Sequence, residues 1–505
     1  MPDNKPIRLV HCAWATGIGG GVARFDAYLN RYLNRDIIDP TFVITKKRIS
    51  GEVMFDEAME FVYTGDHDRF EALLKEFAFA DVVSFQGGFD PLVCEAARVS
   101  GAPALVEIIH TIEPGGIYPG IDVTVCISET VRAQQADKNR AEVIYNGIDT
   151  DEFTFREEAN PKDKIVILQA TNRDKPYFNL DELANDILSI DPRIELWLAG
   201  GGQDGTSTDR IKFFGLHPDI GKLYRKADIL VMFTKSEAFG LAIVEAMASG
   251  AVPVVINENG PAEIVTDSVD GFIAPSSERE ELIEAINRAV KARSSEKWSQ
   301  MRINARRTVE RKFKAERCVR EYEKLYLKLI ELKGRRKKPG PLSGMPTAEA
   351  HLADALFHLQ NARWADCSRS LEKMASGDET INQPACALAA AKFARQATAR
   401  GEPALAGKIY RKIYFSGFKY PEWMQEWLLV LPQAEADDFP VNDLLELDGY
   451  KERTVMLVAE RLINKGDIMS AIAILEKGAT TNPESDEIQK VYELLKARFG
   501  SCDGK

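Results

Sequence analysis

The chain has 505 residues, of which 45% are hydrophobic and 28% are charged, and its net charge is -12. This length predicts about three domains, each with enough apolar residues to bury a core. The acidic balance argues against a general nucleic-acid binder, because such proteins present a basic surface to the phosphates.

The sequence has no feature typical of a secreted or membrane-embedded protein. No segment approaches the roughly 20 apolar residues of a membrane span, and the N-terminal apolar run is too short for a signal peptide. The seven cysteines are scattered and never spaced C-x-x-C, so neither a disulfide framework nor a zinc site is expected. We therefore expect a cytoplasmic protein whose contact with a membrane is at most peripheral.

The first part of the chain alternates strand and helix patterns. A buried strand is predicted over 7–13, then comes a glycine-rich turn over 17–21, and then a helix over 22–33. Strand, glycine turn and helix form the opening unit of a doubly wound fold. Because Val22 takes the last glycine position of G-x-G-x-x-G, the turn either contacts a ligand or is simply a tight turn. Strands follow over 41–45, 81–85, 104–109 and 123–127, and helices over 68–77, 91–99 and 129–135.

His110 follows the strand predicted over 104–109 and opens a loop rich in glycine and proline. Residues at the carboxyl ends of strands in open α/β sheets line the ligand crevice. His110 is therefore a candidate site residue, and the alternative is a histidine that only makes structural hydrogen bonds.

A second series of strands begins after the segment 143–149, VIYNGID. Strands are predicted over 164–170, 195–199, 211–215 and 228–233, with a helix over 220–226. The first of them leads into a basic loop containing Arg173 and Lys175, and the second leads into the glycines 200–202. These elements indicate a second doubly wound half.

The stretch 235–275 predicts a loop, a short helix from about Gly240 to Gly250, a buried strand over 251–256 and a second loop. Glu245 lies within this helix among alanine, isoleucine, valine and methionine, where an unpaired carboxylate would be costly. Glu245 therefore needs a partner. One hypothesis is a salt bridge to a lysine or arginine, and the other is that Glu245 accepts hydrogen bonds from a ribose diol while amides at the helix start face a phosphate.

The pattern E-A-F-G-x4-E-A-M-A-x-G-x-P-V-V, followed by G-P-x-E-I-V and D-G-F-I-A-P, resembles the donor-binding segment of glycosyltransferase family 4, the retaining GT-B enzymes. The resemblance implies that Glu237 lies near the transferred sugar and that Glu245 binds the nucleotide ribose. It also implies that Phe239, Gly240 and Leu241 contact the sugar and diphosphate of the donor, a sugar nucleotide such as a UDP- or GDP-sugar.

The same resemblance assigns roles outside this stretch. It implies catalytic or donor-binding roles for His110 and for Arg173 and Lys175 beside the diphosphate. It implies donor-binding roles for the glycines of two turns, Gly19, Gly20 and Gly21 in the first and Gly200 in the second. The family's arginine and lysine are normally further apart than Arg173 and Lys175. The alternative for at least one of these two is therefore a solvated side chain or a pair with Asp174.

Glycosyl transfer develops positive charge on the sugar and negative charge on the leaving diphosphate. A metal enzyme would use a D-x-D motif, and the two candidates, Asp66-His67-Asp68 and Asp149-Thr150-Asp151, fall in a loop and at the hinge. We therefore expect no metal and no cofactor, because helix amides near Gly240 together with Arg173 or Lys175 can meet the charge.

After residue 275 the pattern becomes helical. A helix over 279–292 is predicted to begin with a capping pattern formed by Ser277 and Glu280, and residues 297–333 are mostly helical. The segment 334–346 predicts a linker whose basic run over 335–338 is either a solvated hinge or a contact for an acidic lipid surface or partner.

From residue 347 onward only helices are predicted, over 351–360, 364–375, 385–399, 404–415, 422–429, 455–464, 468–479 and 486–499. The segment around Gly466 and Asn482 resembles a tetratricopeptide repeat, and the earlier pairs fit that period poorly. We expect a degenerate helical-repeat domain, and the concave surfaces of such domains usually bind a polypeptide.

The predicted architecture is thus α/β, with two Rossmann-like domains of the GT-B type facing a cleft, followed by an all-α domain. The predicted divisions are an acceptor-side domain over 1–155, a donor-binding domain over 156–312, crossover helices over 313–333, a linker over 334–346 and the repeats over 347–500. The predicted function is a retaining, metal-independent hexosyl transfer from a sugar nucleotide to a protein, glycan or lipid-linked glycan that the repeats select. The alternatives are a GT-B sugar-nucleotide epimerase or phosphorylase-like enzyme, and a protein-binding scaffold with a degenerate transferase half.

Overall fold

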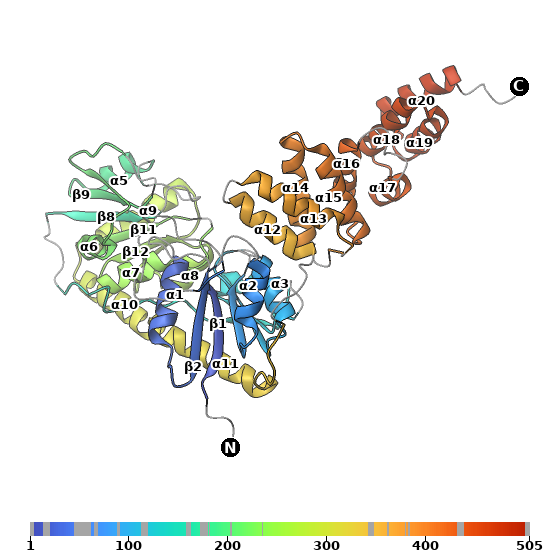
Figure 1. Cartoon of the computed structure of the whole chain (residues 1–505). Helices are drawn as coiled ribbons and strands as arrows, with labels where there is room; N and C mark the ends of the chain where they lie inside the picture. Colours follow the sequence, from blue (N-terminus) through green and yellow to red (C-terminus); the bar gives the residue numbers. More distant parts are fainter. Residues whose placement is uncertain are drawn as a thin grey trace, which may run out of the picture. The chain divides into compact units, whose positions relative to one another are not determined.

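The chain forms two compact units, Met1–Gly344 and Met345–Lys505, which are described separately (Figure 1). The computed structural model describes residues 5–13, 21–44, 62–64, 69–87, 91–112, 120–157, 163–171, 180, 182–201, 205–234, 236–341, 348–360, 363–378, 380–381, 384–431 and 439–499. The two units separate inside the segment 334–346, which the sequence predicts to be a linker.

The N-terminal unit contains two parallel sheets. The first has the strand order β3-β2-β1-β4-β5-β6-β7 and the second has the order β10-β9-β8-β11-β12-β13. The bounds in the first sheet are β1 Ile7–Ala13, β2 Ile38–Ile44, β3 Val62–Tyr63, β4 Val82–Gln86, β5 Ala104–Ile109, β6 Val123–Cys126 and β7 Ala141–Val143. Those in the second are β8 Ile165–Ala170, β9 Ile194–Ala199, β10 Ile211–Gly215, β11 Ile229–Met232, β12 Val252–Ile256 and β13 Phe272–Ala274.

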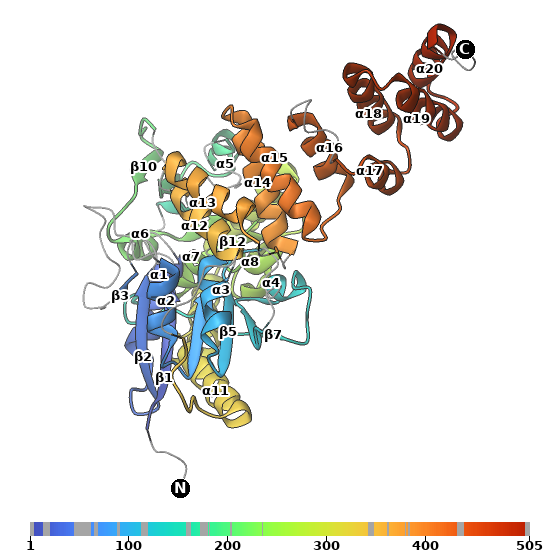
Figure 2. The same ribbon diagram turned by 45° about the vertical axis from the view of Figure 1, so that its right-hand side comes forward.

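Helices connect and cover these strands (Figure 2). They are α1 Gly21–Tyr32, α2 Arg69–Phe77, α3 Pro91–Ser100, α4 Glu129–Ala133, α5 Ala184–Ile190, α6 Ile220–Lys226, α7 Leu241–Ser249, α8 Asn259–Ile264, α9 Arg279–Arg293, α10 Lys297–Lys312 and α11 Ala315–Lys333. Most strands of both sheets are buried along their length, which explains why they read as apolar runs and not as alternating patterns.

Helix α7 has glycine at both ends for a conformational reason. Gly240 precedes it with φ of 109° and Gly250 follows it with φ of 93°, backbone conformations that residues other than glycine rarely adopt. Seven of the nine residues between them are buried, and Glu245 is among these. The helix is therefore enclosed almost all round, as its apolar sequence indicates.

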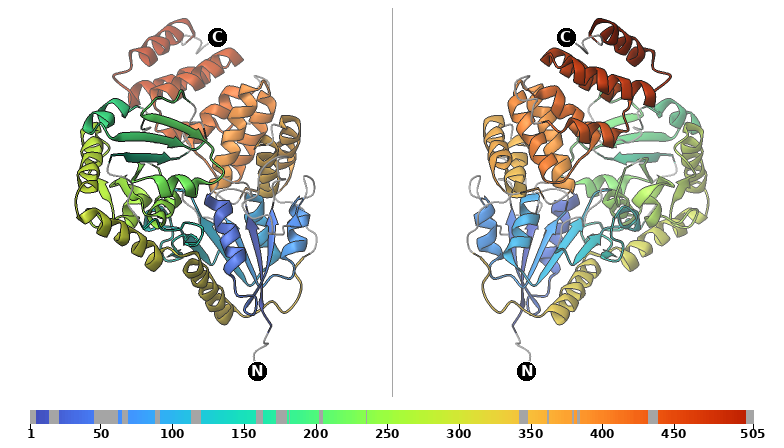
Figure 3. Two further views of the ribbon diagram at one scale, coloured as in Figure 1. Left: turned by 90° about the vertical axis from the view of Figure 1, so that its left-hand side faces the viewer. Right: turned by 90° about the vertical axis from the view of Figure 1, so that its right-hand side faces the viewer.

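Helix α11 comes after the second sheet and packs against α1 and β5 of the first (Figure 3). The Tyr322 ring lies 5.4 Å from the Phe25 ring, and the Tyr326 hydroxyl donates to Ser84 Oγ at 3.3 Å. The backbone N–H of Asn34 donates to the Glu323 carboxylate at 2.6 Å. Helix α11, the last element of this unit, thus completes the core around the first sheet.

The basic segment after α11 is partly bound to the first sheet. Arg336 donates from Nε to the carbonyl of Ala80 at 2.8 Å and from Nη2 to that of Ser100 at 3.0 Å. Its backbone N–H donates to the Asp81 carboxylate at 2.9 Å, and Arg335 donates to the carbonyl of Pro6 at 2.9 Å. The prediction of a solvated hinge is therefore wrong for Arg335 and Arg336.

All the regular elements described in the C-terminal unit are helices, with neighbouring helices packed in pairs. The helices are α12 Ala348–Gln360, α13 Trp364–Ser376, α14 Pro384–Ala399, α15 Pro403–Phe415, α16 Pro421–Val430, α17 Val441–Asp448, α18 Glu452–Lys465, α19 Ile468–Thr481 and α20 Asp486–Phe499. Helices α18 and α19 approach closely at Gly478, where an added Cβ would lie 2.5 Å from Cγ1 of Val455. None of the helices described in the chain is long and apolar enough to cross a membrane.

Several elements were not predicted, namely β3, β7, β13, α5 and α17. All are short, so they offer few residues from which to read a period. The capping pattern predicted at Ser277 is wrong, because Glu278 is the residue before α9 and no side chain caps that helix. The Ser276 hydroxyl instead accepts the N–H of Glu278 at 3.1 Å.

Candidate functional site

A cleft of about 630 Å³ in the N-terminal unit is lined by residues from both sheets. His110 and Thr111 follow β5 of the first sheet, whereas Thr171 and Gly200 follow β8 and β9 of the second. All of them stand at carboxyl ends of parallel strands, which is where open α/β sheets bind ligands.

The predicted residues around the start of α7 line this cleft together. They are Glu237, Phe239, Gly240, Leu241 and Glu245. Gly21, the first residue of α1, lines the cleft opposite them, and a Cβ added there would lie 3.1 Å from Cδ1 of Leu241. The two halves of the unit thus meet at the start of one helix from each.

The carboxylate of Glu245 forms an ion pair with the guanidinium of Arg24 in α1. Glu245 is only 4% exposed, so its charge depends on this partner. Of the two hypotheses for Glu245, the ion pair is the arrangement that the structure contains, and the arginine comes from the opposite side of the cleft.

His110 lines the cleft as a neutral imidazole. Burial, with a smaller contribution from nearby His11, lowers the pKa of His110 to about 3. Its ring meets the Phe25 ring edge-on at 5.0 Å, and its Nε2 has no hydrogen-bond partner among the described residues. At neutral pH His110 can therefore exchange hydrogen bonds with a ligand but adds no charge to the cleft.

Among the cleft residues that sequence reasoning missed are Asn146 and Arg24. Asn146 is 4% exposed, and its Oδ1 also lacks a hydrogen-bond partner among the described residues. Arg24 lies in the first turn of α1, where a cation is unfavourable because it opposes the helix dipole. This unfavourable position was a signal in the sequence that Arg24 has another role. Asn146 carried no comparable signal within VIYNGID.

Gly200 has φ of 123°, and a Cβ added there would lie 1.9 Å from the carbonyl oxygen of Thr171. No other residue fits without moving the end of β8 or β9. The glycine that sequence reasoning singled out thus allows two strand ends to converge on the cleft.

Four predicted site residues lie outside the described residues, namely Gly19, Gly20, Arg173 and Lys175. Of the two D-x-D candidates, Asp66 and Asp68 also lie outside them. The Asp149 carboxylate accepts hydrogen bonds from Arg31 at 3.0 Å and from the Tyr32 hydroxyl at 2.7 Å. Within the described residues no group of three or more histidine, cysteine or acidic side chains could hold a metal ion.

Comparisons with known proteins agree with this arrangement. Residues 149–308, which include Glu237 and Glu245, match the family described as Glycosyl transferases group 1. A glycosyltransferase from Rickettsia africae has a similar structure, with a TM-score of 0.54 and 17% identity over 65% of this chain and 99% of that one. HepE of Anabaena, solved with UDP and glucose, has a TM-score of 0.50 and 16% identity over 64% of this chain and all of its own.

The N-terminal unit has the GT-B glycosyltransferase fold. The predicted fold class, two Rossmann-like halves followed by a helical region, is thereby confirmed. Among curated proteins, an uncharacterized glycosyltransferase of Methanocaldococcus jannaschii is 26% identical over 227 residues, which are 42% of this chain and 60% of the relative. The chain spans less than two thirds of the length of the curated relatives it matches. The cleft described above is thus the GT-B interdomain cleft.

Proposed function

We propose that this chain is a retaining glycosyltransferase of family 4 that transfers a hexosyl group from a sugar nucleotide to an acceptor, without a metal ion and in the cytoplasm. The division at residues 155 and 312, with an acceptor-side and a donor-side domain, is part of this proposal. The six cysteines that the structure describes are all buried.

One observation carries the proposal. Glu237, Glu245 and His110, which the family resemblance singles out, line a single cleft. Two buried polar atoms there, His110 Nε2 and Asn146 Oδ1, lack a partner among the residues that the structure describes. Buried polar groups without partners are rare and costly. A polyhydroxylated ligand such as a sugar nucleotide would supply hydrogen bonds to both atoms.

The donor contacts follow from the side chains on the two faces. Glu245 accepts hydrogen bonds from the ribose diol, and the free amides at the start of α7 face the diphosphate. Since Glu245 is paired with Arg24, the diol displaces the guanidinium. The released Arg24 then lies in the same cleft as the diphosphate and adds a positive charge to those proposed for Arg173 and Lys175.

In the proposed reaction the bond from the anomeric carbon to the diphosphate oxygen breaks, and its electron pair leaves with the diphosphate. The acceptor hydroxyl oxygen bonds to that carbon on the same face, and its proton passes to the departing phosphate oxygen. Glu237 positions sugar hydroxyls, and neutral His110 donates or accepts a hydrogen bond at the sugar. Positive charge around the diphosphate stabilises the leaving group.

The donor is a UDP- or GDP-sugar, and UDP-glucose is the first one to test because HepE of Anabaena was solved with it. The acceptor is a protein, a glycan or a lipid-linked glycan, and we propose that the tetratricopeptide-like C-terminal unit selects it. A sugar-nucleotide epimerase would instead return a changed sugar nucleotide with no acceptor, and a degenerate scaffold would bind no nucleotide.

Substitution of Glu245 tests the proposal. Glu245→Gln keeps the size of the side chain but gives up the charge, so the dissociation constant of UDP, measured by calorimetry on folded protein, should rise about tenfold or more, as expected for a charge-assisted hydrogen bond of 1.5–3 kcal/mol. Glu280→Gln, which changes an exposed carboxylate on α9 outside the lining of the cleft, is a control that should change this constant little. An unchanged constant for Glu245→Gln would remove the transferase proposal.

A further inference from the structure

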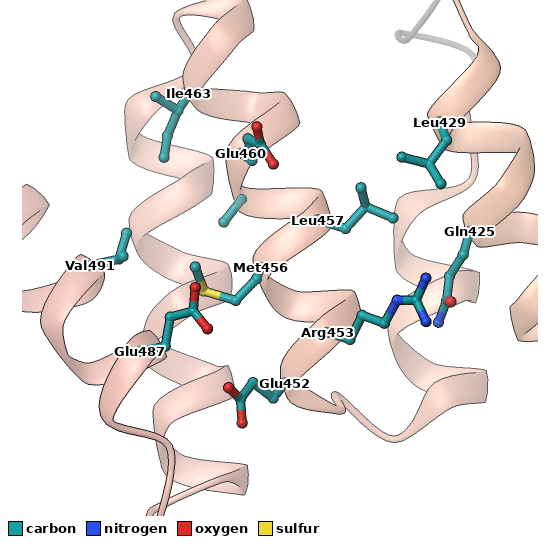
Figure 4. A pocket seen from close by; sticks show the side chains of 11 residues that line it. Gln425, Leu429, Glu452, Arg453, Met456, Leu457, Glu460, Ile463, Glu487 and Val491 are labelled. Carbon is teal, nitrogen blue, oxygen red and sulfur yellow. The ribbon is translucent and has the colours of Figure 1, made fainter.

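A groove of about 740 Å³ in the C-terminal unit lies between α16, α18 and α20 (Figure 4). Its floor is apolar, with Leu429 from α16, Met456, Leu457 and Ile463 from α18, and Val491 from α20. Leu429 is 58% exposed and the other four are half-buried. The groove lies in the C-terminal unit, and binding there does not require transferase activity.

The floor is a second apolar face of α18 and not part of the core of the unit. The core face of this helix buries Val455, Val458 and Ala459. Met456 and Leu457 lie on another side of the helix, toward the groove (Figure 4). The fold thus leaves this apolar face of α18 partly exposed, where an apolar side chain of a ligand can pack.

The rim of the groove is acidic. Three exposed carboxylates, Glu452, Glu460 and Glu487, stand around it against one guanidinium, that of Arg453. In the part of the chain that the structure describes, none of these four side chains has an ion-pair partner. A basic ligand would therefore find carboxylates that are not already neutralised.

The spacing along α18 defines the ligand further. Glu452, Met456 and Glu460 follow each other at four-residue intervals, so they form one stripe, with the two carboxylates about 12 Å apart along the axis. In an extended peptide, side chains at positions i, i+2 and i+4 share one face and span about 13 Å. A basic residue, an apolar residue and a second basic residue at those positions match the stripe.

We propose that this groove binds an extended segment of a separate protein with the pattern basic–x–apolar–x–basic, where basic is lysine or arginine. The apolar side chain lies over Met456 and Leu457, and the two basic side chains face Glu452 and Glu460. Glu487, on α20, adds a third carboxylate across the groove from this stripe.

The test uses the full chain and a fluorescein-labelled octapeptide, Gly-Ser-Lys-Ser-Leu-Ser-Lys-Gly, with binding followed by fluorescence anisotropy. Two comparison peptides carry glutamate in place of both lysines, or serine in place of leucine. We expect the lysine peptide to bind at least tenfold more tightly than the glutamate peptide and about threefold to tenfold more tightly than the serine peptide. A third peptide with the two lysines adjacent tests the spacing and should bind more weakly.

Variants of the chain locate the contact. Glu452→Gln combined with Glu460→Gln should weaken the lysine peptide about fivefold, and Met456→Ser should weaken it by a similar factor. The matched control is Glu493→Gln, which removes a carboxylate from α20 outside the groove and should have little effect.

The proposal is overturned if no peptide binds at about 1 mM, a concentration at which even weak complexes form. It is also overturned if the glutamate and lysine peptides bind equally, or if Glu493→Gln weakens binding as much as the groove variants do, since either result would mean that the groove does not recognise the pattern. Sedimentation of the chain alone tests whether a second copy of the chain occupies the groove. A dimer that dissociates on Met456→Ser would show that a second copy fills the groove, and it would replace our proposal.

Discussion

Arg24 and Glu245 belong to different halves of the N-terminal unit, and their ion pair means that the proposed ribose acceptor already has a partner. A ligand that uses Glu245 has to exchange with this arginine. The exchange is compensated if the guanidinium then contacts the diphosphate, because hydrogen bonds between charged groups are the stronger ones.

This exchange predicts a difference between two ligands. In the variant Arg24→Met, UDP should bind about tenfold more weakly because a cation near the diphosphate is lost. Uridine, which has no phosphate, should not lose affinity, since the competitor for Glu245 is gone. Calorimetry with both ligands measures the difference, and Arg24→Lys is the charge-preserving control. An equal loss for uridine and UDP would mean that Arg24 acts only by holding Glu245 in place.

The low pKa of His110 leads to a prediction about the stability of the protein in acid. The pKa of His110 is about 3 in the folded protein. Between pH 6.5 and pH 3 His110 is therefore protonated in the unfolded chain but neutral in the folded chain. The folded state therefore loses about 1.4 kcal/mol of stability for each pH unit below 6.5 through this residue. His110→Asn lacks this loss, so acid should cost the natural protein about 2 kcal/mol more than the variant between pH 7 and pH 5.

Urea unfolding of both proteins at the two pH values measures this effect. Ionisable groups far from His110 are present in both proteins, so their contributions cancel in the comparison. The same pH dependence in both proteins would contradict a neutral, buried His110.

At the scale of elements, the convergence of β8 and β9 on the cleft depends on Gly200. Gly200 and Gly215 both have positive φ and are joined by a hydrogen bond of 2.7 Å from the N–H of Gly200 to the carbonyl of Gly215. They differ in the space available, because a Cβ on Gly200 meets the Thr171 carbonyl whereas one on Gly215 meets nothing within 4 Å.

This pair gives a matched prediction. Gly215→Ala should lower the free energy of unfolding by about 1–2 kcal/mol, the cost of a left-handed alanine. Gly200→Ala should cost at least as much for its φ of 123°, which is less favourable for alanine, plus about 1–3 kcal/mol for the steric clash. It should also weaken UDP binding, which Gly215→Ala should not, because only Gly200 lines the cleft. Similar results for the two variants, by urea unfolding and calorimetry, would contradict this reading of the strand ends.

Elements and site differ in how far the sequence predicted them. The strands 7–13, 104–109 and 211–215 and the helices 220–226 and 486–499 agree with the structure at both ends. Short runs rich in apolar residues and amphipathic periods are strong local signals. The two-residue β3 and the three-residue β7 and β13 gave no period to read. Glu237 and Glu245 stood out by motif, whereas the contact of Arg24 with Glu245 joins residues far apart in the chain and no local pattern encodes it.

At the scale of the whole molecule, the two compact units predict a division of labour. Deletion of 345–505 should leave slow hydrolysis of the sugar nucleotide unchanged, because the GT-B cleft lies wholly within residues 1–344. Transfer to the acceptor should be lost if the C-terminal unit selects it. Release of UDP and modification of the acceptor are measured separately on the same preparation. Equal loss of both activities would count against this division.

The return of α11 to the first sheet also matters while the chain is being synthesised. The hydrophobic interior around Phe25 and Ser84 is not closed until Tyr322 and Tyr326 have left the ribosome. At a synthesis rate of roughly 5–20 residues per second, the first strands remain without those side chains for on the order of tens of seconds. The nascent first half should thus bind chaperones until the second half has emerged, and a ribosome stalled before residue 315 should present it in a protease-sensitive form.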